Sequence, residues 1–302
     1  MSDNKVLVGC TSTGCIEYAP ERYRNPGIRF IRVHIVFKGK EFLEGPEFDP
    51  DAFYKELETL KDPKNNLPHT AMPTVAEIHE FFDKAVDDGF KEVFIIALSS
   101  ALGGTYNLIR IVGEEYKNKL KVTVIDSKIT CFGEGLLAIK ARELFDKGAD
   151  TETVLKEIGW IMRRQEFVGV DGKLDYLIYN GRLKGGKALM GKMMNICPLI
   201  HFSKEGEITP IASVRTPKKA LMKACEEIKK ITGDRSSEDY ILFKVYTGKS
   251  LIKELDKIEK DYGIECNHEP VIMSPVSGCH NGPWLAGYGY FPIRRADENL
   301  DE

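Results

Sequence analysis

Residues Val93–Thr105 read VFIIALSSALGGT, and this stretch decides the fold class. Its first six residues form a continuous apolar run, which is typical of a strand covered on both faces. A loop containing Gly103 and Gly104 follows, and a helix is expected over about Thr105–Lys117. A buried strand that leads through a short loop into a helix indicates a parallel sheet covered by helices.

The rest of the first half repeats this alternation. Asp49 or Asp51 can cap one helix, and Thr74 with Glu77 forms a capping box ahead of another, which ends near Gly89. We expect further strands at Lys5–Gly9, Phe30–Phe37 and Val122–Ile125, and further helices at about Ala52–Leu60 and Glu134–Lys147. Residues 1–165 are therefore predicted to form an amino-terminal α/β lobe.

After about Gln165 the predicted strands outnumber the helices, which indicates an α+β domain with a mixed sheet over residues 166–302. The strands are expected at Leu174–Tyr179, Pro198–Phe202, Ile208–Val214, Tyr240–Thr247, Pro270–Met273 and Leu285–Phe291. The helices are expected at about Lys187–Met194, Pro217–Ile231 and Lys249–Tyr262. A chain of 302 residues is long enough to divide into two domains. The predicted fold class is α/β with two lobes.

Composition excludes several classes of protein. Hydrophobic residues make up 42% and charged residues 29%, which is globular rather than disordered composition. The net charge of −3 provides no basic field for a polyanion, so nucleic-acid binding is not expected. The longest apolar run is too short to span a bilayer, so stable membrane insertion is not expected. The first residues lack the apolar segment of a signal peptide, and a cytoplasmic protein is expected.

Cysteine and histidine spacing predicts no metal site. The seven cysteines are scattered, and none forms a C-x-x-C pair. A disulfide framework or a structural zinc site would need closer, paired spacing. The six histidines likewise form no cluster with metal-ligand spacing.

One stretch nearly matches a nucleotide-binding loop. Residues Gly181–Ala188 follow the pattern G-x-x-x-x-G-K-[ST], except that Ala188 stands where a hydroxyl would bind magnesium. The missing ligand argues against nucleotide hydrolysis and favours a basic loop that meets an anion or a partner.

Three loops carry candidate site residues. Ser99–Thr105 leads into a helix, where free backbone N–H groups suit a carboxylate or a phosphate; a plain capped turn is the alternative. Asp126–Lys128 follows a strand at the edge where open α/β sheets place ligands. Ser274–Pro283 is dense in turn-forming residues and contains His280, although a lone histidine is more often structural than functional.

The chain resembles the DegV family of bacterial fatty-acid-binding proteins. The resemblance rests on eight motifs in the family's order along nearly the whole length. They are Thr70-x-x-Pro73, Ser99-Ser100-x-Leu102-x-Gly104-Thr105-Tyr106, Val124–Lys128, Gly133-x-Gly135, Gly181–Leu183, Asn195-Ile196-x-Pro198, Arg215 with Lys218–Ala220, and His280-x-Gly282-Pro283.

The resemblance implies a binding protein rather than an enzyme, with a long-chain fatty acid as its ligand and no cofactor. The ligand's carboxylate is expected at the interface between the lobes, held by Thr70, Ser99, Gly103, Gly104 and His280. Such proteins present the carboxylate to a separate ATP-dependent fatty acid kinase, which forms an acyl phosphate and feeds phospholipid metabolism.

The basic residues Arg182 and Arg215 match positions on the face that meets the kinase. Both lie in loop-like segments, so their guanidinium groups are expected to project into solvent near the mouth of the cleft.

Three positions depart from the family pattern and bear on the head group. Gly103 replaces a serine, Thr70-Ala71-Met72-Pro73 lacks a hydroxyl and an amide, and Thr11-Ser12 lacks an acid. These changes predict weaker acid binding or a different head group, unless water or the amides of Gly103 and Gly104 fill the gap.

Two other functions stay open at this stage. One is a phosphotransferase-like enzyme acting on a small substrate through His280 or Cys10, although no base is paired with a nucleophile in the sequence. The other is a regulatory module whose pocket has decayed.

Overall fold

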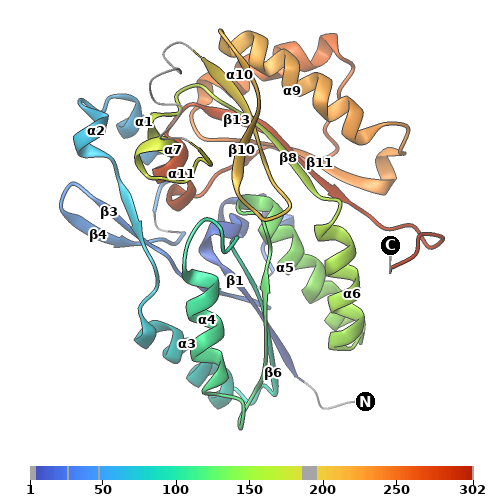
Figure 1. Ribbon diagram of the computed structural model, residues 1–302. Helices are drawn as coiled ribbons and strands as arrows, with labels where there is room; N and C mark the ends of the chain where they lie inside the picture. The colour runs from blue at the N-terminus through green and yellow to red at the C-terminus, as the bar shows by residue number, and fades with distance from the viewer. Residues whose placement is uncertain (1–4, 26, 47, 186–195, 301–302) are drawn as a thin grey trace.

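A computed structural model describes residues 5–25, 27–46, 48–185 and 196–300 (Figure 1). The first large sheet has four parallel strands in the order β2-β1-β6-β7. Its strands are β1 (Val6–Thr11), β2 (Ile28–Ile31), β6 (Glu92–Ala97) and β7 (Lys121–Asp126). The run Val93–Ala97 is fully buried, as its apolar sequence predicts.

Helices cover both faces of this sheet. Those on one face are α3 (Val75–Asp87) and α4 (Thr105–Glu114), and those on the other are α5 (Cys131–Asp146) and α6 (Thr151–Met162) (Figure 1). The capping box predicted at Thr74 and Glu77 is present at the start of α3. Helix α6, which begins after the capping residue Asp150, was not predicted from the sequence.

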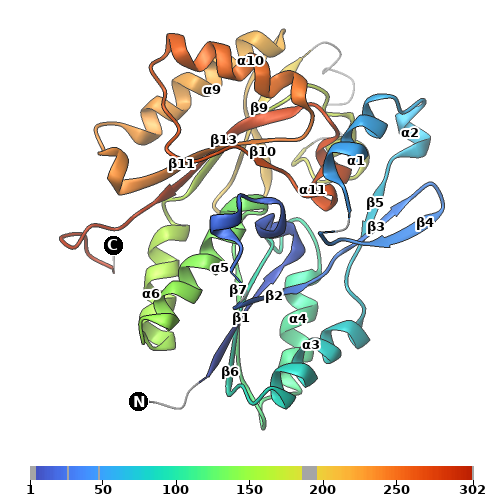
Figure 2. The same ribbon diagram turned by 180° about the vertical axis from the view of Figure 1, so that it is seen from behind.

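The second large sheet is mixed, with the strand order β10-β9-β8-β13-β11-β12. Its strands are β8 (Glu166–Asp171), β9 (Cys197–Phe202), β10 (Ile208–Val214), β11 (Tyr240–Tyr246), β12 (Val271–Ile272) and β13 (Leu285–Pro292). Only β11 and β12 pair in parallel among its described strands. Helices α9 (Pro217–Thr232) and α10 (Lys249–Asp261) cover its outer face (Figure 2). The predicted α/β class with a parallel and a mixed sheet is confirmed.

A small antiparallel sheet, β4-β3-β5, projects to one side of the molecule (Figure 1). Its strands are β3 (His34–Phe37), β4 (Lys40–Leu43) and β5 (His69–Ala71). The single strand predicted over Phe30–Phe37 is therefore wrong, because the chain leaves the parallel sheet after Ile31. Arg32 pairs with Glu17, with Nη1 2.7 Å from Oε2, and the Val33 amide donates to Ser12 Oγ at 3.1 Å. These contacts with the segment after β1 separate β2 from β3.

Short helices surround the small sheet and the join to the second sheet. They are α1 (Pro50–Glu58), α2 (Pro63–Asn66), α7 (Asp175–Tyr179), α11 (Pro275–Asn281), and the 3-10 turns η1 (Ser12–Gly14), η2 (Ile16–Tyr18), η3 (Glu21–Tyr23) and η4 (Ser237–Asp239). The turn-rich stretch around His280 thus forms helix α11, in which the Ser274 side chain accepts from the Ser277 amide.

The strand predicted at Leu174–Tyr179 is wrong, because Asp175–Tyr179 is helix α7. A short apolar run cannot distinguish a strand from a buried helical turn by periodicity alone. Strand β8, which begins the second sheet, was not predicted. The helix predicted at Lys187–Met194 lies outside the described residues.

Helix α5 joins the two large sheets. Its side chains are buried on almost every side, from Cys131 to Ala141 with few exceptions, and the core cluster that contains it draws residues from both sheets. The Phe132 ring packs edge-on against Phe243 of β11, with centroids 5.1 Å apart. Apolar burial on both sides of α5 therefore holds the sheets together.

A second join lies at the tip of the β9–β10 hairpin. Ser99 Oγ, at the end of β6, donates to the Gly206 carbonyl at 2.9 Å. Gly206 has φ +85°, and a Cβ there would overlap Ser99 Oγ and lie 2.9 Å from Lys128 Cα. Only glycine fits this position without strain or displacement.

We expect Gly206→Ala to destabilise the protein by about 2–4 kcal/mol, the sum of the left-handed backbone cost and the overlap. Gly148→Ala is the matched control, because Gly148 has φ +86° and open space around the position of a Cβ. It should cost only about 1–2 kcal/mol. Urea unfolding measures both free energies, and equal losses in the two variants would show that the hairpin tip makes no close contact.

Candidate functional site

A pocket of about 260 Å³ lies between the loop that follows β6, strand β5 and helix α11. Its polar lining residues are Thr13, Thr70, Thr105, Thr130, Arg182, Ser277, His280 and Asn281. Its apolar lining includes Val33, Met72, Leu98, Leu102, Ile208 and Val276. Both halves of the chain contribute to the wall, at the carboxyl ends of the parallel strands, where α/β folds place ligands.

Thr70 and His280 meet in this pocket although 210 residues separate them. Thr70 lies on β5, where it pairs with Ile35 of β3, and His280 lies in the last turn of α11. Thr70 Oγ1 and His280 Nε2 are 3.0 Å apart and share a hydrogen bond. Their expected proximity is confirmed, while their contact with a ligand stays a prediction.

The imidazole of His280 is neutral. Burial lowers its pKa to about 3, and the nearby Arg182 guanidinium and His69 add to the effect. His280 Nδ1 is shielded from solvent and has no hydrogen-bond partner among the described residues. An unsatisfied buried nitrogen costs free energy, so this atom is ready to bond to a group that enters the pocket.

Arg182 supplies a positive charge in the pocket wall. It is half-buried, its Nε donates to the Leu102 carbonyl at 3.2 Å, and its Nη1 donates to the Asn180 carbonyl. Burial lowers the pKa of the guanidinium, which nevertheless stays charged at neutral pH. The expectation that the Arg182 guanidinium projects into solvent is therefore wrong, because it lines the pocket and its nitrogens bond to the carbonyls of Leu102 and Asn180.

Backbone lines the pocket at Gly103 and Gly104. Gly104 immediately precedes helix α4, whose first-turn N–H groups have no partner within the helix. A Cβ at Gly104 would lie 2.7 Å from Met72 Sδ, whereas a Cβ at Gly103 would meet open space. Gly103 therefore leaves open space, and a side chain at Gly104 would collide with Met72.

Two predicted site residues lie away from the pocket. Ser99 is fully buried, and its hydroxyl donates to Gly206 and accepts from the Ala101 amide at 3.2 Å. These bonds link the end of β6 to the tip of the β9–β10 hairpin, and Ser99 is not among the residues that line the pocket, so its contact with a ligand stays a prediction. Arg215 is exposed just after β10 and is absent from the pocket lining.

Glu134 is the buried residue near the pocket that sequence reasoning missed. Its carboxyl accepts from Thr13 Oγ1 at 2.7 Å and also contacts Thr11 Oγ1. A buried acid from the first turn of α5 thus lies beside Thr11. The signal was present in Gly133-Glu134-Gly135, a charged residue between two small ones at the start of an apolar helix.

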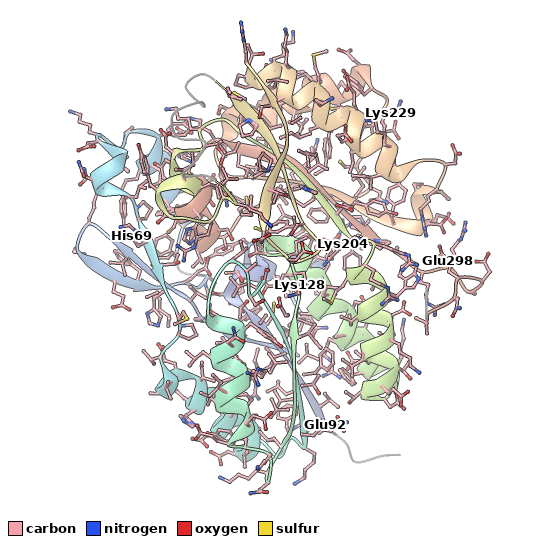
Figure 3. The ribbon with its side chains drawn as sticks, in the orientation of Figure 1. His69, Glu92, Lys128, Lys204, Lys229 and Glu298 are labelled. Atoms are coloured by element: carbon pink, nitrogen blue, oxygen red, sulfur yellow. The ribbon has the colours of Figure 1, made fainter. Side chains whose placement is uncertain are left out.

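A second cleft, of about 760 Å³, lies on the other side of the β9–β10 hairpin. Lys128 and Lys204 approach each other there from the two halves of the chain, as Figure 3 shows. Of the Asp126–Lys128 loop, Lys128 lines this cleft, and none of the three residues lines the Thr70–His280 pocket. Lys128 Nζ pairs with Asp126 Oδ2 at 2.6 Å. No group of three or more metal-ligating side chains occurs in the described ranges.

The family model described as "Uncharacterised protein, DegV family" matches residues 8–292. The chain belongs to the DegV family. The resemblance stated from the motifs is thereby confirmed.

Curated DegV domain-containing proteins align with this chain over most of their length. A DegV domain-containing protein of Clostridium acetobutylicum is 27% identical over 86% of this chain and 90% of its own. One from Listeria innocua is 28% identical over 94% of this chain and 98% of its own.

Solved DegV structures share the fold. The fatty-acid-binding DegV family protein of Streptococcus agalactiae has a TM-score of 0.85 and 25% identity, over 96% of this chain and 99% of its own. A DegV lipid-binding protein of Thermotoga maritima has a TM-score of 0.78 and 25% identity, with the same coverage. In the part of this chain that the structure describes, no helix has the length and hydropathy needed to cross a membrane.

The depressed pKa of His280 predicts acid sensitivity of the ligand-free protein. A histidine with a pKa of about 3 when folded and 6.5 when unfolded stabilises the fold above pH 6.5, and this contribution is lost as the pH falls toward 3. His280→Asn removes the titrating group. Urea unfolding of the ligand-free proteins should therefore show a shallower loss of stability with acid in the variant. The same slope in both proteins would mean that His280 is not desolvated.

Proposed function

We propose that this protein binds a long-chain fatty acid, with the carboxylate in the Thr70–His280 pocket, and presents it to a separate ATP-dependent kinase in the cytoplasm. The observation that supports this most is the convergence of a hydroxyl, a neutral imidazole with an unpartnered nitrogen and a guanidinium on one small pocket. The fatty-acid-binding DegV protein of Streptococcus agalactiae, with the same fold, supports the ligand class.

The polar groups suit a carboxylate because a buried anion must be paired and hydrogen-bonded. Arg182 supplies the charge, Thr70 and His280 supply directional hydrogen bonds, and the amides at Gly103 and Gly104 can donate in place of the missing serine. His280 donates through one ring nitrogen when neutral, and pairing with an anion raises its pKa.

The apolar side of the pocket suits the start of an acyl chain. Leu98, Leu102, Ile208 and Val276 line it, and each methylene removed from water contributes about 0.8 kcal/mol. A sixteen-carbon chain thus has on the order of 10 kcal/mol available. Because the pocket of about 260 Å³ is smaller than typical ligand pockets, we expect the lining side chains to move apart for a full-length chain.

The protein acts in this proposal as a carrier rather than as the catalyst. The loop Gly181–Ala188 lacks the hydroxyl that nucleotide-hydrolysing loops use for magnesium. Arg215 is exposed and free to meet the phosphate or carboxylate groups of a partner kinase, for which guanidinium groups are suited. The proposed role of Arg215 is to dock the kinase, whereas the proposed role of Arg182 is to pair with the carboxylate of the fatty acid.

Mass spectrometry of organic extracts from the purified protein tests the ligand directly. The expected result is a co-purified long-chain acid in roughly equimolar amount. The proposal fails if repeated extracts are empty and the delipidated protein binds neither oleate nor palmitate in calorimetry.

The two arginines should separate binding from presentation. Arg182→Ala removes a charge-assisted contact of about 1.5–3 kcal/mol, so oleate affinity should fall about tenfold or more. Arg215→Ala should leave affinity within about threefold, because an exposed charge contributes little to a shielded ligand. When a bacterial fatty acid kinase and ATP are added, the Arg215→Ala variant should form acyl phosphate about tenfold more slowly than the wild type.

Lys229→Ala is the control for this pair, since Lys229 is an exposed cation on α9, far from the pocket (Figure 3). It should change neither affinity nor turnover. Equal loss of affinity in both arginine variants, or unchanged turnover in Arg215→Ala, would contradict the two assignments.

A further inference from the structure

A ring of hydroxyl and carboxyl oxygens lies directly behind the pocket wall. Glu134 is fully buried in the first turn of α5, and Thr13 stands between its carboxyl and the pocket. Thr13 Oγ1 lies 2.7 Å from Glu134 Oε2 and 2.8 Å from Thr11 Oγ1, and Thr11 Oγ1 contacts Glu134 Oε1. These three oxygen–oxygen contacts close the ring.

Counting protons fixes the charge of this ring. Three hydrogen bonds need three protons, and the hydroxyls of Thr11 and Thr13 supply one each. The Leu98 amide donates to Thr11 Oγ1 at 3.1 Å from outside the ring, so its proton does not close any of the three contacts. The third proton must come from the carboxyl of Glu134. An ionised carboxylate would leave one contact as two lone pairs facing each other.

The surroundings of Glu134 favour the same neutral state. The Cys10 thiol of β1 donates to Oε1 at 3.7 Å, and Cys131 of α5 donates to Ser277 Oγ at 3.4 Å. Burial raises the pKa of Glu134 to about 8, and burial also raises that of the Cys10 thiol. Among described residues no cation contacts the carboxyl, and charged groups on neighbouring elements have their own partners. They are Glu17 with Arg32, Arg29 with Asp88, Glu92 with Lys121, Glu152 with Lys156, and Glu157 with Arg294.

Strand β13 also packs against α5, through the apolar residues Leu285 and Phe291, while its tyrosines Tyr288 and Tyr290 lie on the other face of the sheet, in the core with α9 and α10. Tyr288 donates to Glu259 at 3.2 Å, and the Tyr290 ring packs on Tyr240 with centroids 5.4 Å apart. Neither is a partner of Glu134, and burial raises the pKa of both, so they stay neutral.

We propose that Glu134 is a positioning residue whose proton is required for ligand binding, because it closes the ring and keeps the wall behind the head group uncharged. This inference rests on the proposed function, in which the ligand is an anion. The three hydrogen bonds of the ring can all point one way or all point the other way. In both arrangements the Thr13 hydroxyl donates its proton to another atom of the ring, so it offers the pocket only a lone pair. Loss of the Glu134 proton places a negative charge one hydroxyl away from a bound carboxylate and repels it.

Glu134→Gln is the decisive variant, because an amide offers one donor and one acceptor at the positions of the two carboxyl oxygens. It closes the ring without a titratable proton. Glu134→Ala is a second neutral variant in case the amide disturbs folding, which circular dichroism checks.

The first measurement needs no ligand. Because the folded pKa of about 8 exceeds the ordinary 4.5, protonated Glu134 stabilises the wild-type fold fully below pH 4.5 and loses this contribution as the pH rises to about 8. Urea unfolding should therefore show the wild type losing stability relative to Glu134→Gln across that window. Parallel profiles would overturn the neutral state of Glu134.

The second measurement is oleate affinity of both proteins between about pH 7 and pH 9.5, where the ionisation of free oleate is common to both. Wild-type affinity should fall about tenfold or more, and that of Glu134→Gln less than about threefold. Equal pH dependence would overturn the coupling. Absence of oleate binding by either protein near neutral pH would instead count against the proposed function, while the unfolding profiles would still report on the ring.

Discussion

Burial of α5 between the two large sheets is the constraint on which the pocket depends. A helix that is apolar on nearly all sides must be covered on all sides, and both sheets contribute to the core around it. The loop after β6 extends from the first sheet, with β5 nearby, and α11 directly precedes β13 of the second sheet. Because α5 holds the sheets together, Thr70 and His280 come within hydrogen-bonding distance.

The same burial decides which groups in the pocket region carry charge. Desolvation disfavours the charged form of both an acid and a base, so His280 loses its proton and Glu134 keeps its own. Arg182 is the cation that lines the pocket among described residues, since a guanidinium stays protonated when half-buried. A site with one cation and several neutral hydrogen-bonding groups favours a ligand with a single negative charge.

Much of the fold follows from local sequence. The apolar run Val93–Ala97 and the capping box at Thr74 and Glu77 carry their information within a few residues, and the structure agrees with both. The prediction of a strand at Leu174–Tyr179 was wrong because five apolar residues do not distinguish a strand from a buried turn of helix. The break after Ile31 depends on partners such as Glu17, which local sequence does not bring to the strand.

The site was less predictable, because roles there depend on tertiary contacts. The resemblance of motifs was enough to pair Thr70 with His280. It could not show that the hydroxyl of Ser99 bonds to Gly206, or that the Arg182 guanidinium bonds to the carbonyls of Leu102 and Asn180. Glu134 was missed because its partners, Thr11 and Thr13, lie more than a hundred residues away in the sequence.

A crystal structure of the protein grown with oleate tests the central claim most directly. The account predicts the carboxylate within about 3.2 Å of Thr70 Oγ1 and a ring nitrogen of His280, with Arg182 beside it. Oleate bound with its carboxylate elsewhere, such as in the cleft lined by Lys128 and Lys204, would contradict it.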